Sequence, residues 1–325
     1  MAVSLPPGVT LLERNWLSAN NVLFDDGEHS ALVDSGYCTQ SSQTVDLVTA
    51  ALRGRTLDLL INTHLHSDHC GGNAALQLRY PGLRTLIPPG EAEAVKVWNL
   101  RELSYDATGQ HCPRFEFDDL LLPGQSLDLA GRHWLVKAAP GHDPHAVLLF
   151  EPETRTLISG DALWENGFGV VFPELLGEPS FDCVGDTLDL IESLAPRVVI
   201  PGHGSPFGVQ QDAITPDDLA LAPGSMPPVV RDALARARRR LEQFIRSPEA
   251  HVRYALKVLL KFRLLEWQTV SWTSLLDWAR QTPYLIALHR DHGASQPVEE
   301  WLRELVADLE RSGAARVAGD TVYNA

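Results

Sequence analysis

The stretch "NTHLHSDHCGGN", residues 62–73, places four metal-binding side chains within six consecutive positions. These are His64, His66, Asp68 and His69. Imidazoles two residues apart on an extended segment point to the same side, so His64 and His66 can share one ion. The bend that follows carries Asp68 and His69 to a second position. Packing alone does not explain four such residues in so short a segment, and we therefore expect it to bind metal.

Three further polar residues lie in glycine-containing loops, each after an apolar segment. They are His142 in "APGHDPH", Asp161 in "LISGDAL" and His203 in "IPGHGSP". Taken singly, each is weak evidence, because Gly-Asp and Gly-His are common turn dipeptides. Together with the first segment they supply seven nitrogen and oxygen ligands and no sulfur. Such a set favours zinc, iron or manganese.

Length and composition predict a globular, soluble protein. The chain has 325 residues, of which 44% are hydrophobic and 21% charged, enough for one large domain and a smaller one. The N-terminal residues lack the pattern of a signal peptide, and no apolar stretch approaches the length of a membrane span. The four cysteines form no CxxC pair, which favours a reducing, cytoplasmic location. They are Cys38, Cys70, Cys112 and Cys183.

The net charge of −15 is unevenly distributed: residues 1–221 carry −18 and residues 222–325 carry +3. An acidic body disfavours nucleic acid as a partner, because it offers no broad phosphate-binding surface. The character of the chain also changes at this point, from alternating strand-like and helix-like segments to mostly helical ones. We therefore expect a catalytic domain over 1–221 and a second domain over 222–325.

The second domain has the pattern of a small winged-helix-like module. A helix is expected from Val298 to Ser312, followed by a hairpin with Gly319 and Asp320 at its turn. In the segment 229–245, one helix face is apolar and the arginines lie off it; they are Arg236, Arg239 and Arg240. The pattern favours a solvated basic face over a binding surface.

The motifs occur in an order that resembles the metallo-beta-lactamase-fold hydrolase superfamily over roughly residues 10–210. The strand ending "ALVDSG" is followed by "HLHSDH", "PGH", "SGD" and "PGHG". This resemblance implies a four-layer αββα sandwich of mixed α/β class, with a site for two metal ions at one edge of its two sheets. It places His64, His66 and His142 on the first metal and Asp68, His69 and His203 on the second. Asp161 would bridge the metals, and Asp34 would support the site from behind the ligands.

The chemistry that the resemblance implies is hydrolysis by a hydroxide that bridges two divalent ions, with zinc expected and iron or manganese as alternatives. Two adjacent ions bring the pKa of a shared water towards neutrality and polarise the oxygen of a substrate carbonyl or phosphoryl group. No side-chain nucleophile is then needed. Asp68 could orient the hydroxide and pass its proton to the leaving group.

Departures from the family patterns limit which branch of the superfamily the chain resembles. The main zinc beta-lactamases carry cysteine where this chain has Asp161, and flavodiiron proteins carry glutamate where it has His66. The remaining pattern resembles thioesterases, lactonases and nucleases, and we expect a small ester or thioester substrate. Two alternatives stay open: a single-strand endoribonuclease, which the helical tail resembles, and a persulfide dioxygenase with one iron. For the tail, a role as a lid or a homodimerisation domain is favoured over RNA binding.

The expected substrate pocket lies in the segment "WENGFGVVFPELLGEPSF", which is apolar but interrupted by glycines and prolines. We expect a loop over the metal site, with Trp164, Phe168 and Phe172 lining an apolar pocket. In "PGHDPHA", Asp143 occupies a position that is Ser or Thr in the related motif, and His145 occupies a glycine position. His145 is either a further polar contact or a loop residue without a ligand role.

Overall fold

The computed structural model describes residues 3–210 and 226–325, and the chain divides into two compact units. Unit 1 comprises Met1–Asn99 and Cys112–Glu242, and unit 2 comprises Leu100–His111 and Gln243–Ala325. The predicted boundary between residues 221 and 222 lies outside the described residues. The division into domains at that point therefore stays a prediction.

Unit 1 is built on two six-stranded sheets. The first has the order β1 (Val9–Leu12), β2 (Asn21–Asp25), β3 (Ser30–Val33), β4 (Leu59–Ile61), β5 (Arg84–Ile87) and β6 (Asp119–Leu120). The second has the order β12 (Phe207–Gly208), β11 (Val198–Pro201), β10 (Thr156–Gly160), β9 (Val147–Glu151), β8 (Arg132–Ala138) and β7 (Ser126–Leu129). The segment 21–36 has the pattern of two strands around a turn at Gly27; these strands are β2 and β3, and they pair as an antiparallel hairpin.

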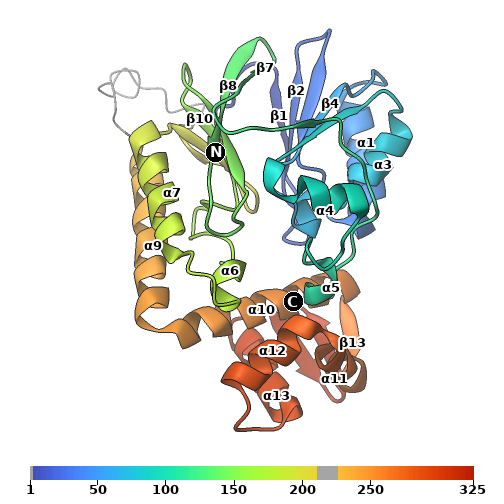
Figure 1. Ribbon diagram of the computed structural model, residues 1–325, viewed down its shortest axis with the longest axis vertical. Helices are drawn as coiled ribbons and strands as arrows, with labels where there is room; N and C mark the ends of the chain where they lie inside the picture. Colours follow the sequence, from blue (N-terminus) through green and yellow to red (C-terminus); the bar gives the residue numbers. More distant parts are fainter. Residues whose placement is uncertain (1–2, 211–225) are drawn as a thin grey trace. The chain divides into compact units, whose positions relative to one another are not determined.

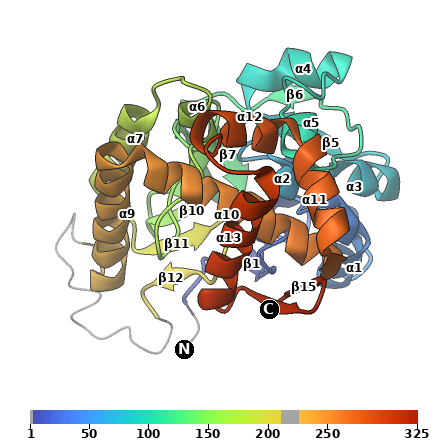
Figure 2. The ribbon, with the colours of Figure 1, turned by 90° about the horizontal axis from the view of Figure 1, so that it is seen from below.

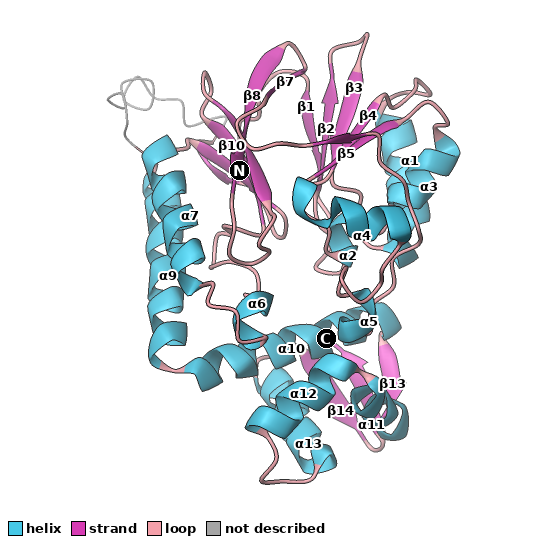
Figure 3. Ribbon diagram, in the orientation of Figure 1, coloured by secondary structure: helices cyan, strands magenta, loops and turns pink. Residues whose placement is uncertain are grey.

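Alternation along the strands places the core between the two sheets. Val22 and Phe24 of β2 face the second sheet, and the ring of Phe24 meets Trp134 of β8 edge-on at 5.1 Å. Leu23, between them in sequence, joins a separate apolar cluster on the opposite face of the first sheet. Strands of this kind are buried on both faces, as a layered fold requires. The two sheets lie face to face in Figure 3.

Helices cover the outer faces of both sheets (Figure 1). Leu32 and Leu60 of the first sheet pack in one cluster with Val48 of α1 (Ser41–Ala51) and Leu76 of α3 (Asn73–Arg79). On the second sheet lie α7 (Phe181–Leu194) and α9 (Pro228–Arg246). The predicted four-layer αββα class is therefore confirmed. The shorter helices are η1 (Cys38–Gln40), α2 (Ser67–Cys70), η2 (Pro89–Glu91), α4 (Ala92–Val97) and α6 (Phe172–Leu175).

The basic residues of α9 make contacts inside unit 1. Arg238 lies 2.7 Å from Asp189 and 2.5 Å from Glu192, both on α7. Arg236 donates a hydrogen bond of 2.8 Å to the carbonyl oxygen of Glu165. Arg236, on the face expected to be solvated, therefore anchors α9 to the loop of Glu165, and Arg238, which lies off that face, anchors it to α7.

Unit 2 combines helices with a three-stranded sheet, and its larger helices are seen together in Figure 2. The helices are α5 (Tyr105–Thr108), α10 (Pro248–Trp267), α11 (Trp272–Gln281), α12 (Pro283–His292) and α13 (Val298–Arg311). The sheet has the order β13 (Thr269–Ser271), β15 (Thr321–Asn324) and β14 (Ala315–Ala318). The helix at 298 and the terminal hairpin are confirmed, whereas the pairing of β13 with that hairpin was not expected. The winged-helix topology stays a prediction.

Two details differ from the expected elements. The segment after Asp161, expected as a loop, contains the short helix α6, which starts at Phe172 with Pro173 in its first turn. The apolar segment 56–63 has the pattern of a buried strand, but only the three residues of β4 form one. In the described part of the chain, no helix has both the length and the apolar character needed to cross a membrane.

Candidate metal centre

The ligand-type residues of unit 1 follow the ends of five strands. Asp34 follows β3, residues 64–69 follow β4, His142 follows β8, Asp161 follows β10 and His203 follows β11. β3 and β4 are parallel, as are β10 and β11, and β8 runs in the same direction as β10 because both are antiparallel to β9. The C-terminal ends of these strands therefore lie at one edge of each sheet. Residues far apart in sequence meet there.

Asp34 holds the loop that follows β4. Its carboxylate accepts hydrogen bonds from the backbone N–H of Thr63 at 2.9 Å and from the Thr63 hydroxyl at 2.8 Å. It also lies 2.7 Å from Nδ1 of His69. Asp34 has a φ of 58°, which places it in the left-handed region that few residues other than glycine adopt. These three contacts and this backbone conformation hold the Asp34 carboxylate in place. Asp34 in turn fixes Nδ1 of His69, so that Nε2 of His69 faces the site.

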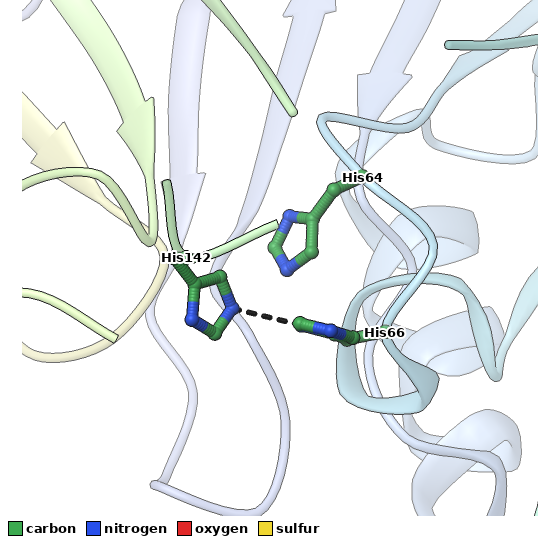
Figure 4. Close-up of side chains that lie close together, drawn as sticks. All are labelled: His64, His66 and His142. Carbon is green, nitrogen blue, oxygen red and sulfur yellow. Dashed lines mark hydrogen bonds between the residues drawn. The ribbon is translucent and has the colours of Figure 1, made fainter. Parts of the chain in front are cut away.

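The first group comprises His64, His66 and His142, whose rings point towards one another (Figure 4). Nδ1 of His66 and Nε2 of His142 are 2.8 Å apart. One ligand atom from each of the three residues lies within 4.8 Å of the other two. The structure thus brings together the three residues predicted for the first metal.

The second group comprises Asp68, His69 and His203, and it meets the same criterion of 4.8 Å. Nε2 of His203 lies 3.1 Å from Oδ2 of Asp68. His69 is fully buried, whereas the Asp68 side chain is 16% exposed. These are the three residues predicted for the second metal.

Asp161 lies between the two groups. Its Oδ2 is 3.4 Å from Nε2 of His142 in the first group. Its Oδ1 is 3.3 Å from Nε2 of His69 and 3.8 Å from Nε2 of His203 in the second group. The two oxygens of one carboxylate therefore face different sets of imidazoles, which is the position expected of a bridging ligand.

Most of the ring nitrogens that face away from the site also have neighbours, whereas Nδ1 of His203 is buried and has no hydrogen-bond partner among the described residues. Nδ1 of His142 lies 2.5 Å from the carbonyl oxygen of Val170, and Nδ1 of His64 lies 3.1 Å from the Thr63 hydroxyl. Nε2 of His66 lies 3.9 Å from Oδ2 of Asp143, which is buried. Such contacts orient imidazole rings and select their tautomers.

Burial determines the charge of the first group. It lowers the pKa of His66 and that of His142 to about 4 each, and it holds the pKa of His64 well below its ordinary value. All three imidazoles are neutral at neutral pH. A neutral imidazole is the form that binds a cation.

Neighbouring opposite charges determine the protonation state of the second group and of Asp161. Burial acts to lower the pKa of His69, but the carboxylates of Asp34 and Asp161 raise it well above its ordinary value. Burial acts to raise the pKa of Asp161, but His203 and His69 hold it well below its ordinary value. Asp161 is therefore ionised, and a cation bound here would displace the proton of His69.

Buried nitrogen atoms provide a direct test of whether these residues suit a metal. Among the described residues, Nε2 of His64 and Nε2 of His69 are buried and have no hydrogen-bond partner. A buried polar atom without a partner is costly, and it is rare in folded proteins. Both atoms face the site, so a cation would satisfy them. The donor set therefore fits divalent metal binding.

Two glycines allow the backbone to approach these rings closely. A Cβ on Gly202 would lie 2.4 Å from Oδ1 of Asp161 and 2.8 Å from Cε1 of His69. A Cβ on Gly169 would lie 2.3 Å from Nδ1 of His142. Any larger residue at either position would displace a ligand-type side chain.

The residues expected to line a pocket have different environments. Trp164 donates a hydrogen bond of 3.1 Å from Nε1 to Oδ1 of Asp161, and Phe172 meets the ring of His66 edge-on at 5.4 Å. Both therefore lie beside the candidate ligands. Phe168 is 1% exposed and forms part of the core. His145 is exposed, and its ring lies against Gly90.

Trp16 was not predicted. Its ring stacks on that of His203 with an interplanar angle of 6° and a centroid distance of 5.4 Å, although 52% of the residue is exposed. The neighbouring Asn20 holds its loop to the loop of His203, donating from Nδ2 to the carbonyl oxygens of Pro201 and Gly204. No pattern in "ERNWLSANN" marks these residues, because their role depends on contacts between distant loops.

The family model that matches the chain is that of the metallo-beta-lactamase superfamily, and the match covers residues 14–203. This range contains Asp34 and all seven ligand-type residues. It ends at His203, the last of them.

Three relatives show what the sequence is similar to. A hydroxyacylglutathione hydrolase of Stenotrophomonas maltophilia is 28% identical over 49% of this chain and 50% of its own length. A second hydroxyacylglutathione hydrolase, from Haemophilus influenzae, is 26% identical over 63% of this chain and 92% of its own length. An acyl-coenzyme A thioesterase of Bos taurus is 24% identical over 64% of this chain and 82% of its own length. The chain thus spans only half the length of the first of these.

Solved structures share the fold of the whole chain. A beta-lactamase domain protein from Burkholderia ambifaria aligns with a TM-score of 0.59 at 20% identity, covering 99% of this chain and 94% of its own. A metallo-beta-lactamase family protein from Thermus thermophilus aligns with a TM-score of 0.53 at 20% identity, covering 99% of this chain and 100% of its own.

Proposed function

Because the chain belongs to the metallo-beta-lactamase superfamily, we propose that it is a metal-dependent hydrolase of a small thioester. The observation that carries this proposal is the position of Asp161, whose two oxygens face two separate groups of imidazoles. A pair of metals suits hydrolysis of a carbonyl compound. The thioesterases among the relatives support the choice of a thioester over an ester.

The proposed ligands are the atoms that face the site. His64 Nε2, His66 Nδ1 and His142 Nε2 would hold one divalent ion. A second ion would be held by the remaining group, which consists of Asp68, His69 Nε2 and His203 Nε2. Asp161 would contribute one oxygen to each. Zinc suits this nitrogen-and-oxygen set, and iron or manganese would be compatible with it.

Bound in this way, the metals would supply an acidified water and a Lewis acid for the substrate carbonyl. The chain would then supply the proton transfer. Asp68 is the more accessible of the two carboxylates, with 16% of its side chain exposed against 6% for Asp161. We assign to Asp68 the transfer of a proton to the departing sulfur.

Other residues would orient the ligands. Asp34 fixes His69, and the carbonyl of Val170 fixes His142. Asp143 would do the same for His66 from the opposite side of its ring. Because each partner contacts the nitrogen that faces away from the site, each favours the tautomer whose free lone pair points inward.

The apolar rings beside the site suit an apolar acyl group. Trp16 and Trp164 flank His203, and Phe172 flanks both His66 and His142. A thioester with a hydrocarbon acyl chain would remove part of this aromatic surface from water.

The contacts of two arginines in α9 weigh against the RNA alternative. Arg236 and Arg238 are engaged by a backbone carbonyl and by two carboxylates of unit 1, respectively. A phosphate-binding surface needs arginines that are available to the ligand. The dioxygenase alternative uses one iron, and the closeness of Asp68, His69 and His203, which could hold a second ion, supports the dinuclear proposal instead.

A substrate panel tests the proposal. Metal-loaded protein is assayed on an acyl-coenzyme A, a glutathione thioester, a lactone and a short single-stranded RNA, with His66→Ala as the control. We expect thioester hydrolysis that the substitution reduces at least about 100-fold. RNA cleavage that the substitution abolishes, without thioester turnover, would overturn the proposal. One iron per chain, with oxygen consumption on a persulfide, would do so too.

A further inference from the structure

Two thiols that the proposed hydrolysis does not use lie side by side in unit 1. Sγ of Cys70 and Sγ of Cys112 are 3.8 Å apart, although the residues are separated by 42 positions in the chain. Cys70 directly follows His69 and is fully buried, whereas Cys112 is partly exposed. The fold therefore pairs a protected thiol with a reachable one at the edge of the candidate metal centre.

The two residues differ in their backbone surroundings. The backbone N–H of Cys70 donates to the carbonyl oxygen of His66, which fixes Cys70 at the end of α2. Cys112 lies in the segment 110–117, which forms neither helix nor strand. A disulfide needs a sulfur separation of about 2 Å. A shift of Cys112 can supply the remaining distance.

We propose that Cys70 and Cys112 form a reversible disulfide when the protein meets a low-molecular-weight disulfide, and that this bond loosens metal binding at the neighbouring loop. The Cys112 thiolate attacks one sulfur of the oxidant, forming a mixed disulfide and releasing one thiol. The Cys70 thiolate then attacks the Cys112 sulfur, and the second thiol leaves. Both protein thiols are oxidised, and one oxidant molecule is reduced to two thiols.

The loss of the Cys70 S–H connects this bond to the metal centre. In the reduced protein that group donates to the carbonyl oxygens of Leu65 and His66, both at 3.3 Å. These carbonyls belong to the loop that presents His64, His66 and Asp68. A disulfide sulfur has no hydrogen to donate, so the loop loses two of its contacts. In a reducing compartment, where we expect this protein, the bond would be transient.

The test uses the full chain loaded with zinc and treated with oxidised glutathione. Peptide mapping is expected to find a Cys70–Cys112 cross-link that dithiothreitol removes. A chromogenic chelator is expected to extract zinc about tenfold faster from the oxidised protein. Neither measurement uses a substrate, so the result does not depend on the proposed thioester hydrolysis.

Single-cysteine variants identify the pair. Cys112→Ser should abolish the cross-link and keep zinc extraction at the reduced rate, whereas Cys38→Ser should respond as the parent chain does. Cys112→Ala serves as a second variant if the serine side chain disturbs folding. The proposal fails if no Cys70–Cys112 peptide forms, if the cross-link leaves zinc extraction unchanged, or if oxidant accelerates extraction equally in Cys112→Ser.

Discussion

Each imidazole of the candidate metal centre has a nitrogen that faces inward and another that faces the surrounding protein. The outer nitrogen of His69 meets a carboxylate at hydrogen-bonding distance, and that of His142 meets a backbone carbonyl. For His66 the buried carboxylate of Asp143 lies 3.9 Å from the outer nitrogen. This residue departs from the Ser or Thr of the related motif, and it gives this chain a carboxylate where the motif has a hydroxyl.

We predict that Asp143→Asn weakens zinc binding about tenfold. Oδ1 of Asp143 accepts from the backbone N–H of His145 at 2.7 Å. In the variant, the amide oxygen can keep this hydrogen bond, and the amide nitrogen then faces Nε2 of His66. Because that nitrogen is a donor, His66 loses the acceptor on the outer side of its ring. Competition titration with a chelator of known zinc affinity measures the change. The exposed Asp186→Asn is the control, and equal affinities in the two variants would refute the role of Asp143.

The chemistry of single residues explains why the sequence identified some site residues and missed others. His64, His66, Asp68 and His69 form a local pattern of residue types that packing alone rarely brings together. Trp16 has no such pattern, because tryptophan is common in cores and at surfaces. Its position beside His203 is established by contacts that join loops far apart in sequence.

The strand ends bring the ligands together, and the turns that follow them need small residues. Gly202 separates β11 from His203 and lies against Asp161 and His69. The sequence showed a glycine in a turn. Only the packed structure shows that the space beside its α-carbon is taken up by side chains of the candidate metal centre.

Gly202→Ala is therefore expected to reduce hydrolytic turnover at least about 100-fold, since displacement of reacting groups by about 1 Å has costs of this size. The added methyl would lie 2.4 Å from Oδ1 of Asp161. Metal content per chain and turnover are measured together. Gly82→Ala is the matched control, because a Cβ there meets no atom within 4 Å. Equal activity of the two variants would contradict the close approach.

In unit 2, α10 contains a buried histidine that makes this unit sensitive to acid. Burial lowers the pKa of His251 from 6.5 to about 4, and its ring packs against Phe244 at 4.8 Å. The unfolded chain therefore binds a proton more readily than the folded one. The stability that the neutral ring contributes is complete above about pH 6.5 and is lost as the pH falls towards 4.

His251→Gln should remove this part of the acid sensitivity. Between pH 7 and pH 5 we expect the parent chain to lose about 1–2 kcal/mol more of its unfolding free energy than the variant does. Urea denaturation at the two pH values measures the difference. The exposed His292→Gln should behave as the parent chain, and an unchanged pH dependence in His251→Gln would exclude the effect.

Helices and strands were predicted best where periodicity was strong. The helix at 298 and the hairpin after it have clear start, stop and turn signals, and both were found. The two ten-residue helices α11 and α12 were not predicted individually from the sequence. A capping serine at Ser271 and a proline at Pro283 mark their starts, but short helices of mixed polarity have weak periodic patterns.

At the scale of the whole chain, the candidate metal centre belongs to unit 1 alone. Its ligand-type side chains are mostly buried, and three ring nitrogens there have no hydrogen-bond partner among the described residues. A metal that binds the folded chain and not the unfolded one stabilises the former by mass action.

Removal of metal should therefore lower the melting temperature of unit 1 by several degrees. Calorimetry of the zinc-loaded chain with and without EDTA measures this shift. The acid-sensitive transition that responds to His251→Gln reports on unit 2, and we expect EDTA to leave it in place. A chelator that lowers both transitions equally would indicate that the metal centre does not belong to unit 1 alone.

The sequence by itself predicted the chemical type of the centre, because its imidazole and carboxylate groups form a local pattern. It indicated the αββα class through the order of its motifs, which resembles that of the metallo-beta-lactamase superfamily. It did not determine that residues 100–111 join unit 2, that Asp161 faces both groups with separate oxygens, or that Cys70 meets Cys112. These features depend on which segments meet after folding. Contacts between residues far apart in the chain leave no periodic pattern in it, so only the tertiary structure could decide them.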